Sequence, residues 1–227
     1  MGRDPRQPSD AGPLPGKTFA RLRAAARPRA YRDGQAIFLK GDDASAGMMA
    51  VDSGRVRIVS NSADGKEVIL RVIGPGEIFG EIAMLDGGTR TADAVAMGDA
   101  EILHVRQTDF LAFLEDNPRL CIDLLKLVCQ RLRSTSEQLE DFSFLDLRTR
   151  LAKGLLHLAS EHGRPVDGGK RIDIAISQQN LAAMMGTSRE AVNRQLRLWQ
   201  DEGLVALRRN TVTVLDSPAL QGLVGEA

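Results

Sequence analysis

Two arginines and a glutamate stand close together late in the sequence, in a segment with a helical pattern. Arg189, Glu190 and Arg194 fall within the first two turns of a helix expected to end near Glu202. Arginine can donate two hydrogen bonds to guanine O6 and N7, and glutamate can accept one from cytosine N4. A helix that enters the major groove with its N-terminus first presents its first two turns to the base edges. These residue types at this spacing are therefore suited to reading DNA bases.

The flanking residues predict a helix, a tight turn and a second helix. Ser177 is the expected N-cap of a helix over Gln178 to Met185, Gly186 ends that helix, and Thr187 or Ser188 caps the next one. One apolar face would hold the two helices together: Leu181, Ala182, Met185, Val192, Leu196 and Trp199. The opposite face would carry Arg189, Glu190, Asn193, Arg194 and Arg197. The alternative is that this charged face is only solvated.

A hairpin is predicted after the second helix. Leu204 to Leu207 and Thr211 to Leu215 read as two strands around Arg208-Arg209-Asn210, which would form a wing able to reach phosphate. From Leu147 onward the chain carries 11 Lys and Arg against 8 Asp and Glu, although the whole chain has a formal net charge of zero. This mild excess of positive charge fits a segment that faces DNA.

The motif Thr187-Ser188-Arg189-Glu190-Ala191-Val192-Asn193-Arg194-Gln195-Leu196, followed by Glu202-Gly203-Leu204-Val205, resembles the CRP/FNR family of bacterial transcription regulators, and the resemblance covers nearly the whole chain. Gly80-Glu81-Ile82-Ala83 with Arg90-Thr91-Ala92 is similar to the phosphate-binding cassette of that family. Thr135-Ser136-Glu137 matches its catabolite activator branch. The resemblance implies an α+β fold, with an N-terminal β-roll that binds a cyclic nucleotide, a long dimerisation helix and a C-terminal winged helix-turn-helix. It also implies these DNA contacts: Ser188, Arg189, Glu190, Asn193, Arg194 and Arg209.

The cassette has side chains that suit a cyclic phosphodiester. Such a group carries one negative charge, needs nearby N–H donors and benefits from a planar cation that donates two hydrogen bonds. Gly80 and Ala83 let the backbone approach on either side of Ile82, Arg90 supplies the cation, and Thr91 is expected to bond the phosphate. Glu81 would repel a phosphate, so it is expected to accept a hydrogen bond from a ribose hydroxyl, the role that the resemblance implies.

Three residues of the long helix complete the site that the resemblance implies. Thr135 would contact the base within its own subunit, Ser136 would come from the partner subunit, and Arg131 would lie near the ligand and the dimer seam. The predicted effector is cyclic AMP. Because Thr91 stands where the catabolite activator has serine, cyclic GMP is an alternative. A further alternative is a vestigial pocket in a family member that senses haem, oxygen or nitric oxide.

The elements that must position these residues change character along the chain. Short alternating runs separated by Gly and Asp dominate from Ala36 to Val105, which predicts a β-roll or barrel. Apolar residues at helical spacing then predict a helix of about 25 residues. Its apolar stripe needs a partner, either a second copy or its own domain. The expected order is a disordered tail (1–16), a nucleotide-binding domain (17–116), the dimerisation helix (117–146) and the DNA-binding domain (147–227).

Composition and motifs exclude several classes of protein. The 227 residues are 43% hydrophobic and 26% charged, values typical of a globular chain, and no stretch approaches the roughly 20 apolar residues of a membrane span. No nucleophile with its base and no phosphate loop with a catalytic lysine appears, so no enzyme is expected. The 2 Cys and 3 His are too scattered to predict a metal site.

The sequence therefore predicts a cytoplasmic homodimer that binds double-stranded DNA at an inverted repeat, with no membrane. The resemblance implies TGTGA-like half-sites and RNA polymerase as a further partner. The second class considered is a nucleotide-binding module that regulates another protein. The predicted helix-turn-helix argues against that class.

Overall fold

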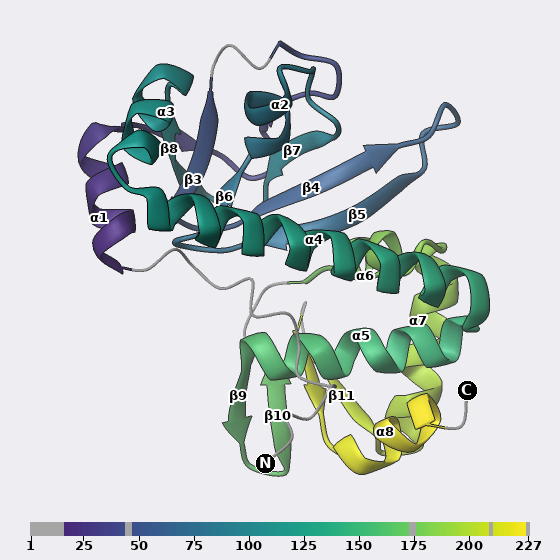
Figure 1. Cartoon of the computed structure of the whole chain (residues 1–227). Helices are drawn as coiled ribbons and strands as arrows, with labels where there is room; N and C mark the ends of the chain where they lie inside the picture. The colour runs from purple at the N-terminus through teal and green to yellow at the C-terminus, as the bar shows by residue number, and fades with distance from the viewer. Residues whose placement is uncertain (1–15, 44–46, 173–175, 209–210, 226–227) are drawn as a thin grey trace. The chain divides into compact units, whose positions relative to one another are not determined.

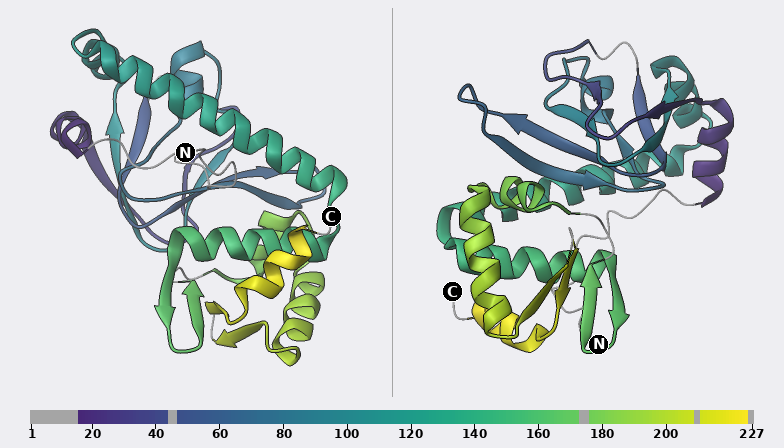
Figure 2. Two further views of the ribbon diagram at one scale, coloured as in Figure 1. Left: turned by 60° about the horizontal axis from the view of Figure 1, so that its bottom comes forward. Right: turned by 180° about the vertical axis from the view of Figure 1, so that it is seen from behind.

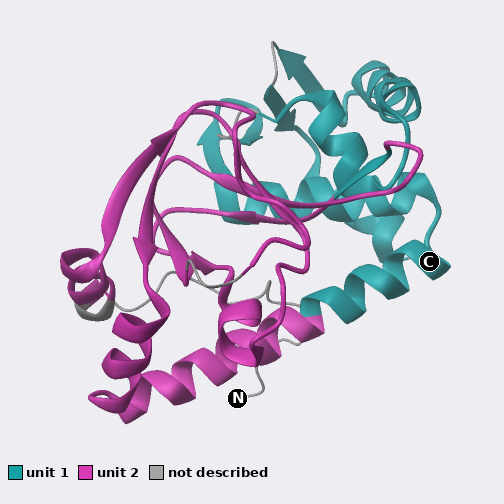
Figure 3. Cartoon of the chain, turned by 90° about the horizontal axis from the view of Figure 1, so that it is seen from above, with its two compact units in different colours: residues 1–8, 66–68, 134–227 teal, residues 9–65, 69–133 magenta. Residues whose placement is uncertain are grey.

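The structure, a computed structural model, describes residues 16–43, 47–172, 176–208 and 211–225. Its contacts divide the chain into two compact units, drawn in different colours in Figure 3. The N-terminal unit is formed by Ser9–Gly65 and Ile69–Arg133, and the C-terminal unit chiefly by Ser134–Ala227. The division falls inside one continuous helix, α4 (Pro118–Phe144), which crosses the middle of Figure 1. The predicted disordered tail lies, except for Gly16, outside the described residues.

The N-terminal unit contains two four-stranded sheets. Paired strands run antiparallel, as in β3 and β8, where Met48 lies opposite Val105. The predicted roll of short strands is therefore confirmed. One sheet has the order β1 (Arg27–Tyr31), β8 (Ala100–Val105), β3 (Met48–Ser53), β6 (Ile78–Phe79), and the other has the order β2 (Ala36–Phe38), β7 (Asp93–Ala96), β4 (Val56–Asn61), β5 (Glu67–Ile73).

Neighbouring residues of β3 belong to two different apolar clusters. Met49 packs in a cluster with Phe79 and residues of the second sheet, and Phe38 lies against its edge. Met48 packs in a cluster with Phe110 and Leu124, which belong to the helices α3 (Gln107–Glu115) and α4. Because successive side chains of a strand point to opposite faces, the β1-β8-β3-β6 sheet is apolar on both sides. It lies between the other sheet and a layer of helices that also includes α1 (Gly16–Ala25).

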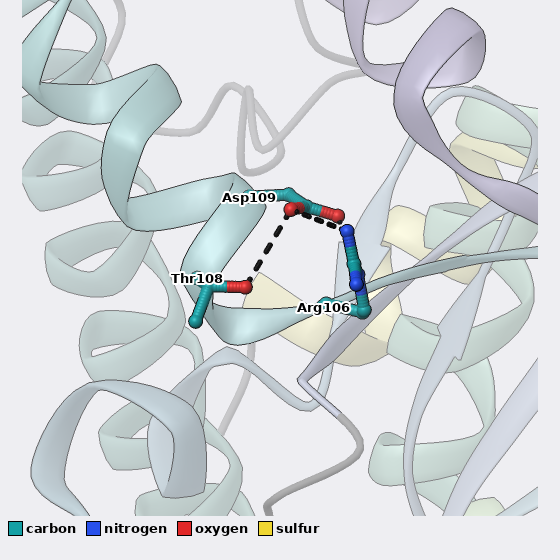
Figure 4. A network of polar contacts seen from close by, with 3 residues as sticks. All are labelled: Arg106, Thr108 and Asp109. Carbon is teal, nitrogen blue, oxygen red and sulfur yellow. Dashed lines mark hydrogen bonds and ion pairs between the residues drawn. The ribbon is translucent and has the colours of Figure 1, made fainter.

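The start of α3 is held by a group of polar side chains (Figure 4). Arg106 donates from Nε and Nη2 to the two carboxylate oxygens of Asp109, at 2.8 and 2.9 Å. Thr108 Oγ1 lies 3.5 Å from Oδ1 of the same carboxylate. The hydrogen bonds from Arg106 lower the pKa of Asp109, so the carboxylate stays charged in the first turn of the helix, where the helix dipole favours a negative charge.

In the C-terminal unit, α5 (Leu147–His162) packs against two further helices and a sheet, and its buried residues include Leu151, Leu155 and Leu158. A hairpin, β9 (Gly163–Val166) and β10 (Gly169–Ile172), follows α5 directly (Figure 1). The other elements are α6 (Gln178–Met185), α7 (Arg189–Asp201), β11 (Val205–Arg208), β12 (Thr211–Val214) and α8 (Ser217–Gly225), seen from two further sides in Figure 2. Helices α6 and α7 confirm the predicted helix-turn-helix, and the hairpin β11-β12 that follows them lies in a sheet of order β11-β12-β10-β9.

Helix α4 begins at Pro118, whose missing N–H is no loss in the first turn of a helix, and spans 27 residues. Only two of its residues, Leu120 and Leu124, are buried. Large apolar side chains further along remain exposed, among them Leu125 at 61%, Leu132 at 67% and Leu139 at 67%. No helix in the described part of the chain is long and apolar enough to span a bilayer.

A histidine and a tyrosine form a hydrogen bond at the β1-β8 edge of the first sheet. Tyr31 Oη lies 3.0 Å from His104 Nε2, and the two rings stack with centroids 6.0 Å apart. Burial lowers the pKa of His104, and the nearby positive charges of Arg29 and Arg90 lower it further. His104 is therefore neutral in the folded protein under conditions where an exposed histidine would begin to bind a proton.

We expect the N-terminal unit to lose stability as the pH falls below about 6.5, the ordinary pKa of histidine. In that range the unfolded chain binds a proton at His104 that the folded chain does not, so stability rises with pH. Urea unfolding at pH 7.5, 6.5 and 5.5 should show a smaller loss for His104→Gln than for the parent. His157→Gln, at an exposed position of α5, is the control. An unchanged pH dependence in His104→Gln would contradict this account.

Candidate functional site

The turn between β6 and α2 (Glu81–Asp86) brings two predicted cassette residues into contact. Gly80 has a φ of 76°, in the left-handed region. A Cβ at this position would lie 2.7 Å from Nη1 of Arg90 and 3.3 Å from Cε1 of Phe38. The carbonyl oxygen of Gly80 accepts a hydrogen bond from Arg90 Nη1 at 2.6 Å. Glycine is therefore needed here for both its backbone angle and the close approach of the guanidinium.

Arg90 is buried, with 2% of its surface exposed. Its Nη2 donates to the carbonyl oxygen of Gly47 at 2.6 Å, and its Cζ lies 4.5 Å from the ring centre of Phe38, within the range of a cation–π interaction. Its Nε is buried and has no hydrogen-bond partner among the described residues. Burial lowers the pKa of Arg90, against the opposing effect of Asp42 and Glu81. The guanidinium nevertheless stays charged, because its ordinary pKa is so high.

Glu81 is also buried and forms an ion pair with the long helix. Arg131 Nη1 donates to Glu81 Oε1 at 2.5 Å, and Arg131 Nη2 donates to the carbonyl oxygen of Ile78 at 2.5 Å. Arg131 thus ties α4 to the end of β6 and the start of α2. The carboxylate expected to accept a ribose hydroxyl is the same one that holds α4.

The structure places the other predicted nucleotide contacts in different surroundings. Ala83 is buried, whereas Ile82 and Thr91 are exposed. Thr135 and Ser136 are exposed residues of α4. Thr135 follows Arg131 by one helical turn and so shares its face of the helix. Sequence analysis did not identify Phe38 as a site residue, because its only recognisable feature was its place in an expected strand. The contact between Phe38 and Arg90 depends on the pairing of segments that are far apart in the sequence.

The helix-turn-helix has the caps that the sequence predicted. Ser177 Oγ accepts from the backbone N–H of Asn180 at 3.0 Å, and Ser188 Oγ accepts from that of Ala191 at 3.2 Å. Gly186 ends α6 with a φ of 61°. A Cβ on Gly186 would lie 3.1 Å from Cε1 of Phe142, so the end of α4 packs against this turn. Val192, Leu196 and Trp199 are fully buried and hold α7 in place.

The outward side of α7 presents most of the predicted base-reading residues to solvent. Arg189, Glu190 and Arg194 are exposed. Hydrogen bonds from its own backbone N–H and from Ser188 lower the pKa of Glu190, so it remains a carboxylate acceptor. Asn193 is half-buried, and its Oδ1 accepts from Gln178 Nε2 of α6 at 3.3 Å. Asn193, a predicted DNA contact, therefore also joins α7 to α6. Arg209, the predicted wing contact, lies outside the described residues.

Comparisons with known proteins identify a domain family for each part of the chain. The sequence profile of the cyclic nucleotide-binding domain matches residues 28–117, and that of the Crp-like helix-turn-helix domain matches residues 149–223. The cyclic AMP receptor protein of Thermus thermophilus is 38% identical over 85% of this chain and 86% of its own. A CRP-like cAMP-activated global transcriptional regulator of Mycobacterium tuberculosis is 30% identical over 89% and 90%, respectively.

Solved structures show the same architecture. The c-di-GMP responsive global regulator CLP of Xanthomonas campestris superimposes with a TM-score of 0.78 and 26% identity, covering 89% of this chain and 100% of that one. The chain belongs to the CRP/FNR family of transcription regulators. It is a cyclic-nucleotide-binding, DNA-binding regulator of the kind found in bacteria. The members of this family are transcription regulators and not enzymes. The described residues contain no group of His, Cys, Asp and Glu that could hold a metal ion.

We expect Arg131→Ala to lower the free energy of unfolding by about 3 to 5 kcal/mol, because it leaves the buried Glu81 carboxylate without a partner. The double variant Glu81→Gln/Arg131→Met should recover much of that loss, because neither buried charge remains. Urea unfolding of the parent, Glu81→Gln, Arg131→Met and the double variant measures the coupling between the two side chains. Additive single and double effects would show that the ion pair is not important for stability.

Proposed function

We propose that this protein is a cyclic-AMP-responsive homodimer that binds an inverted repeat of TGTGA-like half-sites and acts on transcription together with RNA polymerase. The observation that carries the proposal is the position of Glu81, which is buried in the cassette and paired with α4 through Arg131. One carboxylate thus connects the proposed ligand to the helix that leads to the DNA-binding unit. The names of the Thermus and Mycobacterium relatives support cyclic AMP as the effector.

The proposed ligand engages the cassette through two kinds of contact. Arg90 donates hydrogen bonds to the cyclic phosphate. In this structure the guanidinium donates to the carbonyl oxygens of Gly47 and Gly80, and the phosphate either replaces these acceptors or joins them. A hydrogen bond to an anion is roughly twice as strong as one between neutral groups, which favours the exchange. Thr91, exposed beside Arg90, adds a hydroxyl. The ribose hydroxyl donates to Glu81, and this contact competes with Arg131.

Recognition of the base falls to the hydroxyls of α4. Thr135 follows Arg131 by one turn, and Ser136 is the next residue along the chain. Cyclic GMP remains the second candidate effector, since the threonine at position 91 differs from the serine of the catabolite activator. The two nucleotides differ at the purine edge, so their relative affinities decide between these candidates.

The exposed stripe of α4 supports a homodimer. Leu125, Leu132 and Leu139 recur every seven residues and are each more than half exposed. Ile122, Cys129 and Ser136 form a second series with the same spacing, offset by three residues as in the a and d positions of a coiled coil. A second copy of α4 would cover these side chains. Ser136 would then lie on the seam, as expected for a residue that reaches the partner's ligand.

Helix α4 also provides a route from the nucleotide to DNA. Arg131 binds Glu81 near its middle, and Asp141 at its end forms an ion pair with Lys153 of α5 at 2.6 Å. Phe142, one residue further, packs against the turn at Gly186. A ligand that changes the pairing of Arg131 changes the position of α4 and thereby the spacing of two recognition helices. Operator DNA must then tighten nucleotide binding by the same factor.

We expect Arg90→Ala to bind cyclic AMP at least tenfold more weakly than the parent, since loss of a buried charge-assisted contact costs roughly 2 to 5 kcal/mol. Calorimetric titration with cyclic AMP and cyclic GMP measures both affinities. Arg32→Gln, an exposed loop position, is the control, and Arg90→Lys keeps the charge if the alanine variant does not fold. If the Arg90 variants bound each nucleotide as tightly as the parent does, the assignment of Arg90 to the site would be overturned. If the parent bound cyclic GMP more tightly than cyclic AMP, cyclic GMP would be the effector.

We expect Glu190→Ala to relax the base preference at one position of each half-site, with a loss of about 1 to 3 kcal/mol of discrimination. Selection from random DNA in the presence of cyclic AMP should return an inverted repeat whose half-site centres lie roughly 10 base pairs apart or slightly more. Glu202→Ala, at the other end of α7, should keep the parent's preference. A selection without an inverted repeat, or an unchanged preference in Glu190→Ala, would count against this mode of reading.

A further inference from the structure

The ring of Phe38 lies against the buried guanidinium of Arg90. Arg90 Cζ is placed over the face of this ring, 4.5 Å from its centre. The edge of the ring also fits the backbone of Gly80, where a Cβ would lie 3.3 Å from Phe38 Cε1. The carbonyl oxygens of Gly47 and Gly80 accept hydrogen bonds from the same guanidinium. Three neighbours therefore fix this group: two backbone oxygens and one aromatic face.

An irregularity of β2 sets the position of Phe38. Ala36 lies opposite Val95 of β7, but Phe38 lies opposite Ala94, so β2 has one residue more than its partner between these two pairs. Neighbouring side chains of a regular strand point to opposite faces. Ile37 and Phe38 nevertheless both pack against the apolar cluster between the two sheets. An extra residue of this kind, as in a β-bulge, redirects the side chains next to it and is frequent beside functional sites.

Further contacts hold Phe38 in this position. Its ring centre lies 5.9 Å from that of Phe79, with an angle of 32° between the two rings. Two residues after Phe38, the backbone N–H of Lys40 donates to Asp93 Oδ1 at 2.6 Å. The other oxygen of this carboxylate accepts a hydrogen bond from Asn61 Nδ2 at 2.7 Å. The ring is therefore held by β6, and the segment that carries it is held by β4 and β7.

The position of the ring bears on how Arg90 meets an anion. Arg90 is 2% exposed, and its Nε has no hydrogen-bond partner among the described residues. A guanidinium binds a phosphate through two parallel N–H groups, so its orientation determines the strength of the contact. The face of an aromatic ring attracts a cation without adding a negative charge that would compete with the ligand. A ring at this place orients the guanidinium and leaves its charge available to an anion.

We propose that Phe38 is a positioning residue for the cyclic nucleotide, because its ring holds the guanidinium of Arg90 in the orientation that meets the cyclic phosphate. The proposal rests on the nucleotide binding described under Proposed function. Phe38 acts through Arg90 and not by contact with the nucleotide. Its effect on affinity therefore requires the guanidinium, and this requirement separates a positioning role from a direct contact.

The test measures the affinity of the full-length protein for cyclic AMP and cyclic GMP by calorimetric titration. Phe38→Leu removes the ring and keeps an apolar side chain, whereas Phe38→Tyr keeps the ring. The matched control is Phe113→Leu, because the ring of Phe113 also lies under a guanidinium, that of Arg21, at 4.8 Å and outside the cassette. Arg90→Ala and Phe38→Leu/Arg90→Ala complete a double-mutant cycle. Displacement of a fluorescent cyclic nucleotide extends the measurement to weakly binding variants.

We expect Phe38→Leu to bind the nucleotide that the parent prefers about five- to tenfold more weakly, since a desolvated cation–π contact is lost. Phe38→Tyr and Phe113→Leu should stay within about twofold of the parent, because tyrosine keeps the aromatic face and Phe113 lies outside the cassette. In the Arg90→Ala background, Phe38→Leu should cause no further loss, because no guanidinium remains to be oriented.

Binding by Phe38→Leu as tight as that of the parent, an equal loss in Phe38→Tyr, or the same loss in Phe113→Leu would overturn the proposal. A further loss of similar size in the Arg90→Ala background would also overturn it, because the ring would then contact the nucleotide directly. If urea unfolding shows that Phe38→Leu does not fold, Phe38→Met takes its place, since methionine fills irregular space without an aromatic face. Failure of the parent to bind either nucleotide would instead refute the effector proposed above.

Discussion

A carboxylate buried at the start of a short helix needs a cation, and this requirement organises the N-terminal unit. Glu81 is 2% exposed, and Arg131 of α4 supplies the positive charge. An unpaired buried charge would be too costly to keep, so the helix has to lie where the arginine can reach the carboxylate. Arg131 also donates to the carbonyl oxygen of Ile78, which satisfies a second buried group. The cassette and α4 therefore depend on each other for their positions.

The second buried cation is stabilised in a different way. Arg90 has no carboxylate in direct contact among the described residues, and two backbone carbonyl oxygens and an aromatic ring surround it instead. The carboxylates of Asp42 and Glu81 act on the guanidinium only without direct contact, so its positive charge is incompletely compensated and the cassette keeps an attraction for an anion. Glu81, by contrast, has its negative charge paired directly with Arg131.

Sequence reasoning succeeded where the determining interactions are local. The caps at Ser177 and Ser188 and the turn at Gly186 depend on residues within a few positions of one another, and the structure contains all three. The Glu81–Arg131 pair joins residues 50 positions apart, and periodicity carries no information on such contacts. The resemblance placed Arg131 near the ligand without naming its partner. Phe38 was missed for the same reason, because the sequence of a short strand does not indicate which distant residues its side chains will contact.

The contact between Phe142 and the turn at Gly186 has a consequence for how this protein can exchange parts with its relatives. The last turns of α4 belong to the DNA-binding unit. If this unit were transferred to a relative with the junction after Asp146, the turn at Gly186 would lose its contact with the ring of Phe142. A junction before Ser134 keeps that ring with its own turn. Each residue of a helix advances the chain by about 100°, so the junction must also preserve the phase of α4. An exchange of recognition units therefore has to carry the last turns of α4 together with the turn that they contact.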